Sequence, residues 1–314
     1  MEKGTERIEG DRERKGAKRE GEGERERDRP HPSLPPHLSP RMLCPHGCLS
    51  PIGLPLPFLL LLLLSAAHSA ALPHQLGHSR LIALRETRAE GRLVVAPSVA
   101  KADFFQLGSE LGEAVEAGAE WLHFSVQDGR MVPKISFGTP VVAALRNHFP
   151  TTVFDVKLSI IEPERRVADF AQAGADIISV HPEATLQLPA TLDLISSAGC
   201  APGVVLNPGT PLSVIEPVLE PGLVDVIVVM LVNPGHGGPM YMDTALRKID
   251  SIKRLCAQRG MDPWIEVDGG VSAKNARLLI AAGANALVAG GALFKAEDKR
   301  TALRQLRPAG ECQP

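Results

Sequence analysis

Two hydrophobic patterns alternate through the C-terminal two thirds of the chain: short apolar runs rich in β-branched residues, and segments with apolar residues at helical spacing. In the segment from Phe104 to Ala117, for example, Leu107, Leu111 and Val115 lie at i, i+4 and i+8. No hairpin signal joins the runs, so the alternation predicts an α/β fold, a closed parallel TIM (β/α)8 barrel. The strands are expected near Val94, Leu122, Val153, Ile177, Val204, Val226, Ile265 and Ala286.

Polar residues gather where the expected strands end. Active sites of such barrels lie at the C-terminal ends of the strands. Successive strand residues point to opposite faces, so His123, Ser125 and Gln127 share the inward face of the second strand. The residues expected at the mouth of the barrel are Ser98, Gln127, Ser159, His181, Asn207, Asn233 and Asp268.

Glycine pairs follow the last three expected strands. Glycine lets backbone N–H groups approach an anion closely, and barrels often bind phosphate in the loops after strands seven and eight. The loops therefore predict a phosphate site, with Ser98 beside it and His236 able to favour an anion when protonated. The glycines expected to bind phosphate are Gly235, Gly237, Gly238, Gly269, Gly270, Gly290 and Gly291.

Residues 1–92 do not follow the strand–helix pattern. Residues 1–29 are highly charged with almost nothing apolar, which predicts disorder. Met42 is an alternative start, and the apolar run from Phe58 to Leu64 resembles an export signal that is too short to span a bilayer. Residues 74–92 are rich in arginine and poor in acids, as transit peptides are. We expect a mature start between Ala66 and Arg92 and delivery to a plastid, with the secretory pathway as the alternative.

Composition excludes several classes of partner. The 314-residue chain has a formal net charge of −2, and its basic and acidic residues are interspersed in the barrel part, so no nucleic-acid-binding face is expected. Nor do we expect stable membrane association after processing. Cys200, Cys256 and Cys312 have no metal-ligand spacing, and we expect reduced thiols.

Several sequence elements between Leu93 and Leu306 resemble the ribulose-phosphate 3-epimerase family. They are Leu93-Val-Val-Ala-Pro-Ser98, His123, Val126-x-Asp-Gly-Arg130, Val232-Asn-Pro-Gly-His-Gly-Gly238 and Ile265-Glu-Val-Asp-Gly-Gly270. The resemblance implies a barrel over residues 93–308 that interconverts D-ribulose 5-phosphate and D-xylulose 5-phosphate in the pentose phosphate pathway and the Calvin cycle. The resemblance is also compatible with a homo-oligomer.

The resemblance also implies a metal site. In that family a divalent metal (Zn, Mn, Fe or Mg) held by two His and two Asp stabilises an enediolate, while the two Asp take and return protons. His123 matches the first His ligand, and Asp268 matches the second Asp ligand and the proton donor. Ser125 stands at the first Asp position and Lys157 at the second His position, so the metal site of His123 and Asp268 is incomplete. Tight metal binding is therefore not expected, because catalytic sites normally use at least three protein ligands.

The altered positions bear on catalysis. A Ser hydroxyl is a poor base, and losing a general base costs on the order of 10²- to 10⁴-fold in rate. The catalytic candidates are Asp268, Lys157 and, at the position of the missing base, Ser125. We expect Lys157 to pair with Asp268 across the barrel, where it either polarises a bound ketone or forms an inert ion pair. Other departures from the family pattern are Gln127, Lys134, Ser159 and Gly291.

Three functions remain open at this stage. The first is an epimerase with impaired activity, and the second is a non-catalytic paralogue that binds sugar phosphate beside an active epimerase. The third is a metal-free enzyme similar to the related decarboxylase and hexulose-phosphate synthase group, which carries Asp-x-Lys-x-x-Asp. Asp155-Val-Lys157 fits the first half of that motif, but Ile160 occupies its last position.

Overall fold

The computed structural model describes residue 77 and residues 79–308. The export signal expected near Phe58 and the charged segment before it lie outside these residues. Within the described part of the chain, no helix has both the length and the apolar character needed to cross a bilayer.

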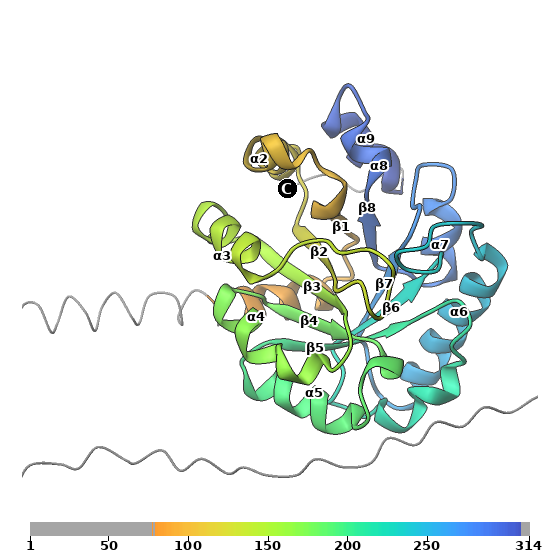
Figure 1. Cartoon of the computed structure of the whole chain (residues 1–314). Helices are drawn as coiled ribbons and strands as arrows, with labels where there is room; N and C mark the ends of the chain where they lie inside the picture. The colour runs from red at the N-terminus through yellow and green to blue at the C-terminus, as the bar shows by residue number, and fades with distance from the viewer. Residues whose placement is uncertain (1–76, 78, 309–314) are drawn as a thin grey trace, which may run out of the picture. The chain divides into compact units, whose positions relative to one another are not determined.

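Eight parallel strands form the barrel, and all eight expected strands are present (Figure 1). The hydrogen-bonded order runs β1-β8-β7-β6-β5-β4-β3-β2. A parallel bridge between Ser98 and His123 links the end of β1 to β2 and closes the ring. The strands are β1 (Val94–Pro97), β2 (Trp121–Gln127), β3 (Val153–Ser159), β4 (Ile177–Val180), β5 (Ala201–Leu206), β6 (Val226–Met230), β7 (Trp264–Asp268) and β8 (Ala286–Ala289).

Helices surround the strands and cover their outer face (Figure 1). After β5 the expected amphipathic α-helix is replaced by two 3-10 helices, Leu212–Val214 and Glu216–Val218. Pro217 lacks the N–H group that a continuous helix beginning at Leu212 would require there. The α-helices are α2 (Leu107–Glu116), α3 (Thr139–His148), α4 (Val167–Ala173), α5 (Leu188–Ser197), α6 (Met242–Gln258), α7 (Ala276–Ala282), α8 (Gly291–Phe294) and α9 (Lys299–Leu306); further 3-10 turns are Val99–Lys101, Phe104–Gln106, Pro163–Arg165 and Pro182–Ala184.

The folded part begins before the barrel boundary at Leu93 that the sequence indicated. Residues 79–89 are helical, and Leu84 is only 3% exposed because it packs into the cluster that also contains Trp121 and Trp264. Arg80 donates a hydrogen bond of 2.7 Å to Asp176, which lies just before β4. These contacts hold the helix against the N-terminal end of the barrel.

Candidate active site

A cavity of about 320 Å³ opens at the C-terminal ends of the strands. Side chains from β2, β3 and β7 line it together with the loops that follow β1, β2 and β6. Of the residues expected at the mouth, the cavity brings together Ser98, Gln127, Asn233 and Asp268, with the catalytic candidates Ser125 and Lys157 beside them. The other three, Ser159, His181 and Asn207, are not part of its lining.

Lys157 and Asp268 form an ion pair inside this cavity, as the sequence predicted. The ammonium of Lys157, on β3, donates a hydrogen bond to Oδ2 of Asp268, on β7. Lys157 is 1% exposed, whereas the side chain of Asp268 is 16% exposed. Burial raises the pKa of Asp268, but the positive charges of Lys157 and His123 outweigh burial and hold that pKa below its ordinary value. The carboxylate is therefore ionised and faces both the ammonium and the cavity.

His123 lies one layer deeper and contacts four oxygen-bearing side chains. Its Nδ1 is hydrogen-bonded to Asp155 and lies 3.1 Å from Oε1 of Glu266. Its Nε2 lies 3.1 Å from Oγ of Ser125 and 3.8 Å from Oδ2 of Asp268. Burial lowers the pKa of His123, but the charges of Asp155 and Glu266 outweigh burial and raise it to about 10. At neutral pH the imidazole is therefore a cation.

Strand periodicity explains these two layers. His123, Asp155 and Glu266 each stand two residues before Ser125, Lys157 and Asp268, respectively, so each pair shares the inward face of its strand. In the β2–β3 register, His123 is opposite Asp155 and Ser125 is opposite Lys157. Sequence reasoning missed Asp155 and Glu266 as site residues. The signal that could have found them is this same spacing of two.

The residues at the mouth do not fit a resident catalytic metal. Ser125 and Lys157 offer no anionic or imidazole ligand, and the ammonium already occupies a carboxylate oxygen of Asp268. That leaves His123 and Asp268, one fewer than the three protein ligands usual in catalytic sites.

The deeper layer has the composition of a metal-ligand set. One ligand atom each from His123, Asp155 and Glu266 lies within 4.8 Å of the others, and all three residues are buried. Burial and the neighbouring Asp155 raise the pKa of Glu266 to about 7. None of the three lines the cavity, so a metal held here would not touch a substrate in the mouth.

His181 also lies buried beside the mouth. Its Nε2 lies 3.0 Å from Oγ of Ser159. Burial, assisted by the charge of Lys157, lowers the pKa of His181 to about 3. The imidazole is neutral at physiological pH and serves as a hydrogen-bonding neighbour of Ser159.

The glycine loops divide between the cavity and its rim. Gly235, Gly237 and Gly269 line the cavity, whereas Gly238, Gly270, Gly290 and Gly291 are not part of its lining. Gly269 has a φ of +111°, and a Cβ there would lie 2.8 Å from a methyl carbon of Val232, so the close turn after β7 requires glycine.

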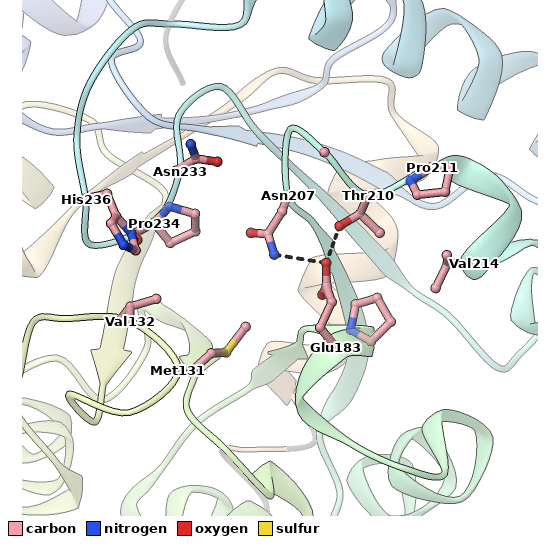
Figure 2. A pocket seen from close by; sticks show the side chains of 12 residues that line it. Met131, Val132, Glu183, Asn207, Thr210, Pro211, Val214, Asn233, Pro234 and His236 are labelled. Atoms are coloured by element: carbon pink, nitrogen blue, oxygen red, sulfur yellow. Dashed lines mark hydrogen bonds between the residues drawn. The ribbon is translucent and has the colours of Figure 1, made fainter. Parts of the chain in front are cut away.

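A second cavity, of about 680 Å³, is lined by residues from the loops after β2, β4, β5 and β6 (Figure 2). The two share Asn233 and Pro234 of the loop after β6. Glu183 accepts hydrogen bonds from Asn207, at 3.0 Å, and from Thr210 on one side of this second cavity. His236, which the sequence placed at the phosphate site, lines the second cavity instead, with Nδ1 3.0 Å from the carbonyl of Pro234.

Comparison with known proteins places this barrel in a family. The family model described as "Ribulose-phosphate 3 epimerase family" matches residues 94–294, and the chain belongs to that family. The chloroplastic ribulose-5-phosphate-3-epimerase of Arabidopsis thaliana is 49% identical over 219 residues, which cover 68% of this chain and 76% of the relative. The ribulose-phosphate 3-epimerase of Synechocystis is 47% identical and that of Escherichia coli K12 is 42% identical, covering 96% and 94% of those relatives and 71% and 68% of this chain, respectively.

Solved structures share the fold at much lower identity. KGPDC from Streptococcus mutans is 15% identical with a TM-score of 0.52, covering 68% of this chain and 96% of its own. The 3-hexulose-6-phosphate synthase from Salmonella typhimurium is 16% identical with a TM-score of 0.51, with the same coverage of 68% and 96%. At such identities the likeness extends to the barrel alone.

Proposed function

We propose that this protein binds D-ribulose 5-phosphate at the mouth of the barrel and interconverts it slowly with D-xylulose 5-phosphate, without a resident catalytic metal. The observation that carries the proposal is the ion pair of Lys157 and Asp268 inside the cavity. Family membership supports the substrate, and the side chains at the mouth support the altered chemistry.

Epimerisation requires a proton to leave the carbon next to the ketone and another to return on the opposite face. The carboxylate of Asp268 accepts or returns the proton on its own face of the substrate. The ammonium of Lys157 donates a hydrogen bond to the ketone oxygen and stabilises the negative charge that develops there as the proton leaves. Both groups line the cavity, so one bound substrate can reach both.

The slow rate in this proposal follows from the weak base on the face of the substrate opposite Asp268. Ser125 lines the cavity there and contacts His123, but a hydroxyl is a weak base. The loss of a general base costs on the order of 10²- to 10⁴-fold. The lowered pKa of Asp268 weakens the other base as well.

The same ion pair also favours a second function. If Lys157 only neutralises Asp268, the protein holds a sugar phosphate without turnover and acts as the partner of an active epimerase.

A coupled assay with D-ribulose 5-phosphate, with chelator and with added zinc or manganese, separates the metal-free epimerase from the non-catalytic partner. A chelator-resistant rate that disappears in Lys157→Ala and in Asp268→Asn supports the metal-free epimerase. Saturable binding without turnover supports the second function, and absence of binding at millimolar ligand contradicts both.

We further propose that the protein is delivered to a plastid. The chloroplastic relative from Arabidopsis supports this location, as does the signal-like and arginine-rich N-terminal sequence. A fluorescent protein fused behind residues 42–92 should accumulate in the plastid. Release of the fusion to the medium would mean secretion instead.

A further inference from the structure

Positive charge exceeds negative charge at the mouth of the barrel. Among the described residues that line the cavity, three are lysines, Lys101, Lys134 and Lys157, and one is acidic, Asp268. Lys157 and Asp268 balance each other through their ion pair. The ammonium groups of Lys101 and Lys134 make no hydrogen bond or ion pair with the described residues, which leaves two positive charges without a counter-charge at the cavity.

The stem of Lys101 lies against the loop after β8. Lys101 ends the 3-10 turn Val99–Lys101 that follows β1. A Cβ on Gly290 would lie 3.0 Å from Cγ and 3.7 Å from Cβ of Lys101, so the glycine makes room for the lysine stem. The stem of Lys101 therefore runs beside Gly290, just after β8, and the side chain lines the cavity.

Lys134 lies in the loop after β2, where the backbone is held by hydrogen bonds and by contact with the loop after β6. Gly129 donates a backbone hydrogen bond of 2.9 Å to the carbonyl of Lys134, and the next residue forms an antiparallel bridge to Asp128. The preceding Pro133 lies 3.2 Å from the position that a Cβ on Gly235 would take. Lys134 is therefore attached directly beside the glycine loop that follows β6.

We propose that Lys101 and Lys134 form a cationic clamp that selects a phosphate monoester dianion over an uncharged sugar. Their two charges match the charge of the dianion, and their attachment points flank the glycine loops whose N–H groups approach the same anion. The clamp rests on the proposed function, because both put the phosphate of the substrate in this cavity. It goes further by assigning the recognition of charge to two side chains outside the glycine loops.

The test compares single and paired substitutions in the full-length protein. Calorimetric titration with inorganic phosphate and with D-ribulose 5-phosphate should show affinity reduced by on the order of tenfold in Lys101→Met and in Lys134→Met, and by about a hundredfold in the double variant. Lys101→Arg should retain most of the affinity, because the charge remains. The differences should shrink with added salt, since the screening length falls from about 30 Å at 0.01 M to about 3 Å at 1 M.

Lys253→Met is the matched control. The stem of Lys253 also packs against a glycine, with its Cδ 2.7 Å from a Cβ position on Gly283, but Gly283 precedes β8 at the other end of the barrel. This variant should bind phosphate as the unmodified protein does. Thermal unfolding of each variant, which should stay near that of the unmodified protein, separates loss of the clamp from loss of the fold.

The outcomes distinguish the clamp from the proposed function. If the unmodified protein binds phosphate and the double variant binds it equally well, the clamp is overturned and the proposed function stands. If the unmodified protein binds neither probe, both are overturned. If Lys253→Met weakens binding as much as the two clamp substitutions do, the effect is one of overall charge and the clamp is again overturned.

Discussion

The ammonium of Lys157 reaches across the barrel from β3 to the carboxylate of Asp268 on β7, so that a buried cation stands within the mouth beside an ionised acid. A buried charge is costly without its partner, so removing either residue of the pair should destabilise the fold. The same pair keeps an acid and a cation together at the cavity, and the proposed proton transfer depends on this arrangement.

Rebuilding the four-ligand set should restore metal-dependent epimerisation. In the double variant Ser125→Asp with Lys157→His, the new carboxylate and imidazole join His123 and Asp268. We expect bound metal in the purified protein and a rate increase of about 10²-fold or more. Metal analysis and the coupled assay measure the two effects. Either single variant should gain less, because one function is still missing, and equal gains in a single variant would contradict the argument.

Breaking the ion pair should destabilise the fold unequally. Asp268→Asn leaves the ammonium of Lys157 buried without its counter-charge, whereas Lys157→Met leaves the more exposed Asp268 in contact with cavity water. We expect Asp268→Asn to lower the free energy of unfolding by about 3 kcal/mol and Lys157→Met to cost less. The double variant should recover part of the loss. Chemical denaturation of the unmodified protein, the two single variants and the double variant gives the coupling free energy between Lys157 and Asp268. Strictly additive losses would show that the ion pair contributes nothing to stability.

The buried His181 should make the fold sensitive to mild acid. Its pKa is about 3 in the folded protein and 6.5 when unperturbed, so between these values the unfolded chain binds the extra proton. The contribution of the neutral His181 to the free energy of unfolding is fully present above pH 6.5. It falls by up to about 1.4 kcal/mol per pH unit as the pH drops below that value. Denaturation curves for the unmodified protein and for His181→Asn should therefore converge as the pH falls from 7 to 5. Parallel pH dependences would contradict a buried neutral imidazole.

The helix of residues 79–89 should be part of the folded barrel. Leu84→Ala removes a side chain that packs with Trp121 and Trp264, and we expect a loss of about 2–4 kcal/mol in the free energy of unfolding. Ile82→Ala is the control on the same helix, because Ile82 is 44% exposed and should change stability little. A chain that starts at Leu93 should be less stable than one that starts before Ser79. Equal unfolding midpoints for those two chains would rule out this role of the helix.

Local periodicity was enough to locate the strands and several of the residues that line the cavity. Each strand is a short β-branched run that is recognisable without its neighbours, and the polar residue after it marks the strand end. The exception is the connection after β5, where proline-rich sequence forms 3-10 turns in place of an α-helix. Glycine spacing likewise located the loops near the cavity, but it did not indicate which of the glycines line the cavity.

The sequence by itself determined the alternation of strands and helices, the polar strand ends and the opposite charges of Lys157 and Asp268. Only the tertiary structure decided that Glu266 and Asp155 surround His123, that His236 lines a neighbouring cavity, and that residues 79–89 pack onto the barrel. Arg80 and Asp176 are 96 residues apart, and His123 and Asp155 are 32 apart. Contacts at such separations depend on strand register and on closure of the barrel, which are set by the packing of the whole chain and leave no local pattern.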